Sequence, residues 1–248
     1  MLFIFMFIVL YFDFQRMLSI KKLQVAYGEK KVLTGLDFTA NVGEITGIVG
    51  LNGSGKTTLL NTIYSEIKPR EGEIVFDNLP NSYRDLPNRI AYLKTQNFFY
   101  QRITGAEYLD LFRMKHPNFN VEEWNAVFRL PLEKWVDSYS TGMKKKLAFM
   151  GILSLNREVI ILDEPFNGLD LETNETLKNI LKILRSKQKT ILVTSHILET
   201  LTTICDRIYY LNDGIMQHHF EAKGYHQLEA LLTKFEYDDL DRLVEGLG

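Results

Sequence analysis

The most constraining feature of this sequence is a glycine-rich loop that directly follows a short apolar run. Residues 44–49 have the character of a buried strand, and residues 56–67 have that of a helix. Between them the chain fits the pattern G-x-x-x-x-G-K-[ST], as Gly50-Leu51-Asn52-Gly53-Ser54-Gly55-Lys56-Thr57. Glycines let successive backbone N–H groups turn inward around an anion, and the positive end of the following helix adds to the attraction. Strand, loop and helix together predict an α/β domain with a polyphosphate-binding site.

The side chains at the end of this loop suit the same ligand. Lys56 would reach the β and γ oxygens of a nucleotide, and the Thr57 hydroxyl would ligate Mg²⁺. The residues predicted to bind the nucleotide here are Gly50, Leu51, Asn52, Gly53, Ser54, Gly55, Lys56, Thr57 and Thr58.

Two adjacent carboxylates, Asp163 and Glu164, end the apolar run 158–162. Neighbouring residues on a strand point to opposite sides, but a turn at the strand end can bring Glu164 to the side of Asp163. Asp163 would then support the metal, and Glu164 would take a proton from the attacking water or orient it. Alone, such a pair could equally be a cap at a strand end. Together with the phosphate loop, it favours a hydrolytic site.

Strand and helix signals alternate along most of the chain, which predicts a mostly parallel sheet covered by helices. The expected strands are 18–27, 32–40, 44–49, 90–93, 158–162, 190–194 and 207–211. The expected helices are 56–67, 104–115, 120–128, 141–155, one through Leu177 to Leu184, and one near 225–233. Thr104 and Glu107 have the spacing of a capping box, and residues 212–214 that of a hairpin turn. The stretch from about 97 to 157 lacks strand signals and is expected to be a helical insertion.

Composition excludes several other classes of protein. With 46% hydrophobic residues among 248, the chain can bury a core of ordinary size. The net charge of -2 gives no electrostatic drive toward nucleic acid. The single cysteine, Cys205, excludes an internal disulfide framework and a four-cysteine zinc site.

The first twelve residues, MLFIFMFIVLYF, differ from the rest because all of them are apolar or aromatic. A helix of that length rises only ~18 Å, too short for a ~30 Å hydrocarbon core. No basic residue precedes the run and no small-residue cleavage pattern follows, so a signal peptide fits poorly. Three interpretations remain open for residues 1–16: an artefact with Met17 as the true start, a weak interfacial anchor, or a segment packed on the domain.

Three further segments occur in a fixed order around the Asp163-Glu164 pair. Ser138-Tyr139-Ser140-Thr141-Gly142-Met143 precedes the Asp163-Glu164 pair, Asn167-Gly168-Leu169-Asp170 follows it, and Thr194-Ser195-His196 ends the next expected strand. With the phosphate loop and Tyr27, they resemble the ATP-binding subunit of an ABC transporter, over Met17 to about residue 217. The first segment is similar to the family's signature, usually written LSGGQ, although Thr141 and Met143 replace the usual glycine and glutamine.

The resemblance implies a fold and a division into parts. The fold would be an α/β P-loop ATPase core with a mostly parallel sheet, an N-terminal antiparallel β subdomain and an inserted helical subdomain at about 97–157. Residues 17–217 would form this domain, residues 1–16 an apolar extension and residues 218–248 a short tail.

The resemblance also implies roles for individual residues. Tyr27 would stack on adenine, a contact worth ~1 kcal/mol. Ser140 and Gly142, at the start of the signature helix, would touch the γ-phosphate held by a second subunit. Asp170 would line the subunit interface, and His196 would hydrogen-bond the γ-phosphate and position the attacking water. Plainer interpretations of Tyr27, as an edge-strand residue, and of His196, as a strand-end histidine, stay open.

Three assignments near these motifs are less direct. The family's glutamine, which bridges Mg²⁺ and the helical insertion, is assigned to Gln96, with Thr95 as the alternative. The aromatic residues 98–100 could form the groove that receives a membrane partner, or could be core of the insertion. The lysines 144–146 are expected to be a solvated helix face.

The resemblance implies an ATPase with ATP and Mg²⁺ as its cofactors. Its catalytic residues would be Glu164, His196, Lys56 and Gln96, and its metal ligands Thr57, Asp163 and Gln96. Its partners would be a second ATP-binding subunit, as homodimer or heterodimer, and transmembrane permease subunits on another chain, with no nucleic acid. It would lie peripherally on the cytoplasmic face of the cell membrane, and the signature style resembles export-type subunits, with import left open. The alternatives are a soluble ABC-type ATPase acting on nucleic acid or ribosomes, and a P-loop kinase or GTPase, which gives no reason for the signature segment.

Overall fold

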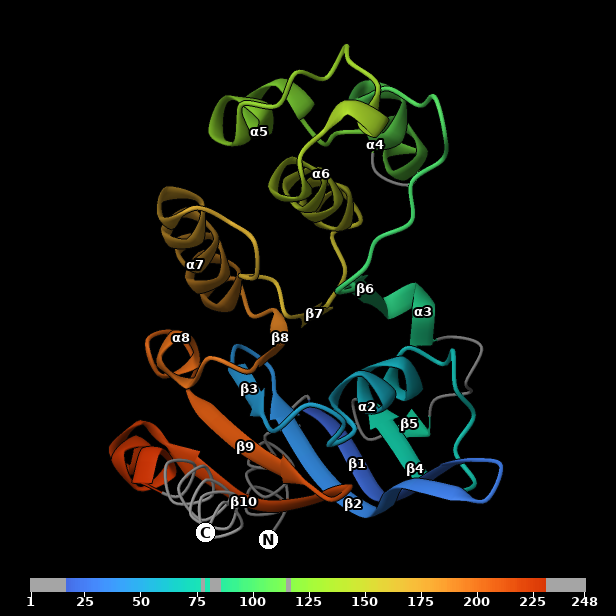
Figure 1. Cartoon of the computed structure of the whole chain (residues 1–248), viewed down its shortest axis with the longest axis vertical. Coiled ribbons are helices and arrows are strands. Elements are labelled where there is room, and N and C mark those ends of the chain that lie inside the picture. The colour runs from blue at the N-terminus through green and yellow to red at the C-terminus, as the bar shows by residue number, and fades with distance from the viewer. Residues whose placement is uncertain (1–16, 77–78, 81–85, 115–116, 231–248) are drawn as a thin grey trace, which may run out of the picture.

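The computed structural model describes residues 17–76, 79–80, 86–114 and 117–230. Two sheets and a group of helices make up this part of the chain (Figure 1). The predictions for residues 1–16, and for the chain beyond residue 230, lie outside the described residues.

The larger sheet is the mostly parallel one that the alternating pattern predicts. Its strand order is β10-β9-β3-β8-β7-β6. The five strands from β9 to β6 run parallel, and β10 pairs antiparallel with β9. The strands are β3 (Ile45–Val49), β6 (Ile90–Leu93), β7 (Val159–Asp163), β8 (Thr190–Ser195), β9 (Arg207–Asn212) and β10 (Ile215–Glu221). Strands β3, β6, β7 and β8 are buried at every residue, as expected for a parallel sheet covered on both faces.

The smaller sheet is antiparallel, with the order β2-β1-β4-β5, which confirms the predicted N-terminal β subdomain. Its strands are β1 (Met17–Tyr27), β2 (Lys30–Asn41), β4 (Glu71–Phe76) and β5 (Leu79–Pro80). The sequence analysis did not predict β4. Its first three residues, Glu71-Gly72-Glu73, are exposed, so the strand shows almost no apolar alternation.

The helices are α2 (Lys56–Ile63), α3 (Leu86–Arg89), α4 (Gly105–Arg113), α5 (Val121–Phe128), α6 (Thr141–Ser154), α7 (Leu171–Ser186) and α8 (Leu198–Thr202). Helix α2 ends before the predicted residue 67. Of the predicted final helix, residues 225–230 are helical and the remainder lies outside the described residues. Within residues 97–114 and 117–157 the structure has helices and no strand, and Figure 1 shows α4, α5 and α6 grouped at one end of the molecule.

Two apolar clusters cover the two faces of the parallel sheet. Alternate residues along β7, such as Ile160 and Ile161, belong to different clusters. One cluster joins the sheet to α6, α7 and α8, and the other joins it to α2 and the antiparallel sheet. The loops at the carboxyl ends of β3, β7 and β8 are therefore fixed by strands that are buried from both sides. The predicted domain boundary at residue 217 falls inside β10, which pairs with β9 as far as Glu221.

Candidate nucleotide-binding site

The glycine-rich loop joins β3, which lies between β9 and β8 in the sheet, to the first residue of α2. Two of its glycines are required by the structure. A Cβ on Gly50 would overlap the carbonyl oxygen of Leu211, and Gly55 has a φ of 109°, in the left-handed region that favours glycine. The loop therefore has the strand before it and the helix after it that a phosphate-binding loop needs.

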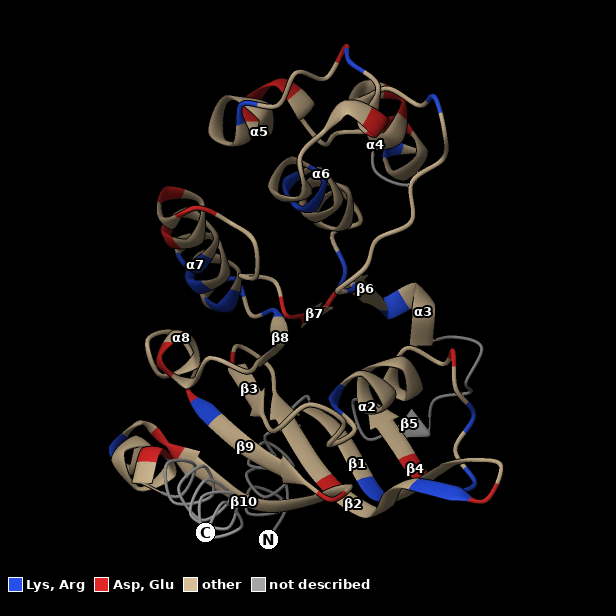
Figure 2. Ribbon diagram, in the orientation of Figure 1, with Lys and Arg blue, Asp and Glu red and all other residues tan. Residues whose placement is uncertain are grey.

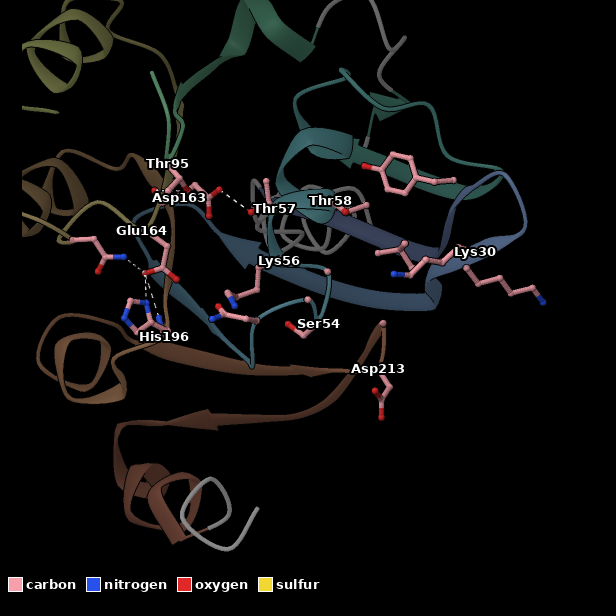
Figure 3. A pocket seen from close by; sticks show the side chains of 18 residues that line it. Lys30, Ser54, Lys56, Thr57, Thr58, Thr95, Asp163, Glu164, His196 and Asp213 are labelled. Atoms are coloured by element: carbon pink, nitrogen blue, oxygen red, sulfur yellow. Dashed lines mark hydrogen bonds and ion pairs between the residues drawn. The ribbon is translucent and has the colours of Figure 1, made fainter. Parts of the chain in front are cut away.

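This loop forms one wall of an open pocket of ≈ 890 Å³, a size that suits a nucleotide (Figure 3). The predicted site residues that line it are Tyr27, Asn52, Gly53, Ser54, Gly55, Lys56, Thr57, Thr58, Asp163, Glu164 and His196. Thr95, the alternative for the glutamine position, also lines it, together with residues that were not predicted: Lys30, Lys31, Val32, Asn167, Asp213 and Gly214. The predicted residues Gly50, Leu51, Gln96, Ser140, Gly142 and Asp170 do not line it.

The side chain of Lys56 is buried and lies against the phosphate loop that precedes it in sequence. Its Nζ donates hydrogen bonds to the carbonyl oxygens of Gly50, at 2.7 Å, and Leu51, at 3.1 Å. Burial lowers the pKa of Lys56, while the nearby carboxylates of Glu164 and Asp163 act in the opposite direction. The two carboxylates that favour the charged lysine are the two predicted to serve the reaction.

Asp163 is almost fully buried and is held from two sides, of which Figure 3 shows the contact with Thr57. Its Oδ2 accepts a hydrogen bond from Thr57 Oγ1 at 2.9 Å, and its Oδ1 accepts one from Thr194 Oγ1 at 2.7 Å. Thr194 comes from β8, so three elements meet at this carboxylate.

The oxygen atoms at this point suit Mg²⁺. A hydroxyl and a carboxylate are hard donors, and Mg²⁺ commonly takes only one or two carboxylates from the protein and completes its shell with substrate phosphates and water. Within the described residues no group of three or more histidine, cysteine, aspartate and glutamate side chains could hold a metal by itself. Ser54 is among the residues that line the pocket, and its Oγ is buried without a hydrogen-bond partner.

Glu164 faces the same pocket as Asp163 because its backbone departs from the strand conformation. Its φ is 51°, which costs a non-glycine residue ~1 kcal/mol or more. The Glu164 N–H donates to Thr194 Oγ1 at 3.0 Å. Its Oε2 lies 3.0 Å from Nδ1 of His196 and accepts from Asn167 Nδ2 at 3.3 Å. A carboxylate next to a histidine at the mouth of the phosphate loop is suited to activating water.

At the position of the family's glutamine, the structure favours the alternative residue. Thr95 lines the pocket, and its Oγ1 donates to the carbonyl oxygen of Asp163 at 3.4 Å (Figure 3). Gln96, to which the catalytic and metal roles were assigned, is exposed and does not line the pocket. The chain reaches the pocket one residue earlier than predicted, directly after β6 ends at Leu93.

The predicted signature residues lie away from this pocket, at the start of α6. Ser140 is exposed and is the N-cap of the helix, where its Oγ accepts from the N–H of Met143 at 3.2 Å. Asp170 caps α7 in the same way, and hydrogen bonds from the backbone N–H and hydroxyl of Thr173 lower the pKa of its carboxyl. An exposed helix N-terminus of this kind attracts anions.

The prediction that residues 144–146 form a solvated helix face is wrong for Lys145. Its side chain is buried, and its Nζ donates to the carbonyl oxygens of Glu164 and Asn167, both at 2.8 Å. Lys146 lies 3.8 Å from Asp170, with its side chain 20% exposed. Lys145 and Lys146 therefore contact the segment that follows β7.

A loop of this sequence between a strand and a helix, with a carboxylate pair at the end of a neighbouring strand, defines a P-loop nucleotide-binding protein. Comparison with known proteins places it more closely. The family model described as ABC transporter matches residues 33–167. The chain is 33% identical over 203 residues to the ABC transporter ATP-binding protein YtrB of Bacillus subtilis, covering 80% of this chain and 70% of that protein. It is 28% identical over 229 residues to NatA of the same organism, covering 88% and 93%.

Solved structures agree with the sequence comparison. An ATP-binding subunit of an ABC transporter superposes with a TM-score of 0.80 at 27% identity, covering 87% of this chain and 94% of that one. The ATP-binding cassette MJ0796, in a dimeric post-hydrolysis state with ADP and Pi, gives a TM-score of 0.72 at 25% identity, covering 83% and 98%. The chain belongs to the ABC transporter family, as an ATP-binding subunit and an ATPase.

Proposed function

We propose that this chain is the motor subunit of a transporter and works as a pair of ATP-binding subunits that close around two molecules of ATP with Mg²⁺. The observation that carries the proposal is the separation of the two half-sites. The pocket is lined by Lys56, Glu164 and His196, whereas the exposed start of α6 at Ser140 lies outside it. A head-to-tail pair would bring the α6 of each subunit to the nucleotide of the other. MJ0796, an ATP-binding cassette whose structure is described as dimeric, supports this arrangement by analogy.

The residues of this chain would divide the work of hydrolysis. The Lys56 ammonium would exchange the carbonyl oxygens of Gly50 and Leu51 for phosphate oxygens. Thr57 and Asp163 would hold Mg²⁺, which supplies positive charge to the phosphates when bound. Glu164 would accept the proton of the attacking water, and His196 would orient that water and contact the γ-phosphate. Loss of the γ-phosphate then removes a bond between the subunits, and the pair opens.

The partner that uses this motion would be a membrane-spanning permease on another chain, with this subunit peripheral at the cytoplasmic face. In the described residues no helix has the length and hydropathy needed to cross a bilayer. Phe98 and Tyr100, whose rings pack 5.1 Å apart, are exposed by 75% and 59% and would receive a permease segment. CbiO1 of Clostridium perfringens, at 25% identity, is described as part of the complex cbiONQ.

Export remains the favoured direction because the signature resembles that of export-type subunits. Nucleic acid is not expected as a partner. Binding to its phosphates calls for clustered Lys and Arg, whereas basic and acidic residues both occur in the helical part and in the sheets (Figure 2).

The test is the variant Glu164→Gln, which keeps the shape of the side chain and removes the base. With ATP and Mg²⁺ it should elute as a dimer in gel filtration and hydrolyse ATP about 100-fold more slowly or worse. With ADP it should elute as a monomer. A Glu164→Gln protein that binds ATP but stays monomeric at saturating ATP and Mg²⁺, alone and mixed with a co-purified partner subunit, would falsify the paired mechanism.

A further inference from the structure

Lys145 is a buried cation whose contacts the proposed mechanism does not use. It lies on α6, and its side chain is 7% exposed. Both of its hydrogen-bond acceptors, the carbonyl oxygens of Glu164 and Asn167, belong to the turn between β7 and α7, 19 and 22 residues away in sequence. A buried ammonium is costly unless it is well hydrogen-bonded, so two short bonds to one turn indicate a specific role.

The turn needs this support because its own backbone holds it weakly. The N–H of Asn167 donates to the Glu164 oxygen at 3.4 Å, and that of Leu169 donates to the Phe166 oxygen at 3.4 Å. Glu164 also has its unfavourable φ of 51°. The two 2.8 Å bonds from Lys145 are the shortest hydrogen bonds that the structure shows to the carbonyl groups of this turn.

Glu164 is therefore fixed on both sides of its Cα. Thr194 Oγ1 accepts from its N–H, and Lys145 Nζ donates to its carbonyl oxygen. With both peptide groups held, the side chain is directed to His196 and into the pocket. Removing the ammonium would free the carbonyl side and let the backbone relax toward an ordinary φ, which moves the carboxylate.

We infer that Lys145 is a positioning residue for Glu164, and that it links the signature helix to the catalytic carboxylate of the same chain. The inference rests on the proposed function of Glu164. Ser140 and Gly142 begin the helix that carries Lys145, and a Cβ on Gly142 would lie 3.2 Å from the Gly168 oxygen, so the helix start also packs against this turn. When α6 of one subunit contacts the nucleotide held by the other subunit, a shift of α6 would therefore change the position of Glu164 in its own subunit.

The experiment compares Lys145→Met, which keeps the length of the side chain and removes the charge, with Lys182→Met as a control on the exposed face of α7. Lys145→Met should lower kcat by ~10- to 100-fold, with KM and the affinity for ATP within about twofold of the unmodified chain. Lys145→Gln, whose amide can donate to both carbonyl groups, should regain part of the loss. Hydrogen exchange at the amides of Glu164 and of residues 166–169 should become faster in Lys145→Met.

A second background separates positioning of Glu164 from a general loss of structure. In Glu164→Gln the carboxylate is already gone, so adding Lys145→Met should change the residual rate by less than about twofold. A kcat unchanged in Lys145→Met, or the same fold-loss in both backgrounds, overturns the inference. If Lys145→Met does not fold, Lys145→Gln is measured in both backgrounds: it should lower kcat by less than Lys145→Met would in the unmodified background, and by less than about twofold in Glu164→Gln. If the unmodified chain binds no ATP, the proposed function fails, whereas the exchange rates still decide whether Lys145 holds the turn.

Discussion

The starts of α2 and α6 are two helix N-termini with the same chemistry and different surroundings. At α2 the N–H groups face a pocket whose walls come from this chain, including Asp163 and Glu164. At α6 the N-cap Ser140 is exposed, and the residues of the pocket lie elsewhere. A helix N-terminus attracts phosphate in either place, but only the first is surrounded by groups that can bind the rest of a nucleotide. In the proposed pair, the pocket and the start of α6 would be the two halves of one site, joined only between two subunits.

The two regions also use buried lysines in different ways. Lys56 donates to carbonyl groups five and six residues away, inside its own loop, so it can change partners without disturbing the fold. Lys145 donates across 19 and 22 residues to a turn of another element. The first lysine is available to a ligand, and the second is committed to tertiary structure.

The largest expected effect concerns the α2 region. Lys56→Ala should weaken ATP binding by at least ~100-fold, or ~2.7 kcal/mol, because it removes the charge that meets the phosphates. Titration calorimetry with ATP measures the change. Lys68→Ala, an exposed lysine shortly after α2, is the control and should bind ATP normally. An unchanged affinity in Lys56→Ala would refute the assignment of the ammonium to the phosphates.

A charge at the start of α6 should separate binding from pairing. Thr141 is exposed at the first position of the helix, where an acidic residue stabilises the helix itself by ~0.3–1 kcal/mol. Thr141→Asp should therefore fold well and bind ATP within about twofold, yet repel the phosphate of a second subunit. In the Glu164→Gln background, gel filtration with ATP and Mg²⁺ should show a monomer for Thr141→Asp and a dimer for Thr141→Ala. A dimer in both would mean that the start of α6 is not the second half of the site.

The features that could be predicted from the sequence are those determined by residues close together in the chain. The phosphate loop is determined by glycine φ values and a strand-helix junction that lie within a dozen residues, so its pattern was enough. The buried strands β3, β7 and β8 were readable as apolar runs. The antiparallel strand β4 was missed because its buried residues, Ile74 and Phe76, follow three exposed ones.

The parts of the site that could not be predicted depend on contacts distant in sequence. That Glu164 would adopt a positive φ follows from Thr194 and Lys145, which approach from other elements. The burial of Lys145 has no local signal, because its neighbours Lys144 and Lys146 give the segment the appearance of a solvated face. The family likeness supplied the order of the motifs. An ungapped match from Tyr92 to Thr104 placed Thr95 at the glutamine position, but the residue type favoured Gln96.

A smaller effect on kcat is expected from Thr95, in the segment that follows β6 and leads to the helical part. Thr95→Val, which keeps the volume and removes the hydroxyl, should lower kcat by roughly 2- to 10-fold, because Thr95 lines the pocket and bonds the Asp163 carbonyl group. Gln96→Ala should leave kcat within about twofold. Steady-state ATPase assays at saturating Mg²⁺ compare the two. The reverse ranking would restore Gln96 to the role that the sequence analysis gave it.

The smallest effect concerns the helical region alone. The predicted capping box of α4 is confirmed: the N–H of Glu107 donates to Thr104 Oγ1, and Glu107 Oε2 accepts from the N–H of Thr104. The hydrogen bonds that Oε2 accepts, first from the N–H and then from the hydroxyl of Thr104, lower the pKa of the Glu107 carboxyl below its ordinary value of 4.5. A carboxyl with a lowered pKa stabilises the fold above its unfolded pKa, and this contribution is lost as the pH falls through the folded pKa.

Glu107→Gln keeps the hydrogen-bonding shape of this cap and removes its charge. It should therefore melt slightly lower than the unmodified chain at about pH 7, and the difference should vanish as the pH falls to about 3. Scanning calorimetry across that range measures the two melting temperatures. ATP affinity at about pH 7 should not change, since neither Thr104 nor Glu107 lines the pocket. A weakened affinity would show instead that α4 and the phosphate loop are energetically coupled, and the contrast between the two regions would have to be given up.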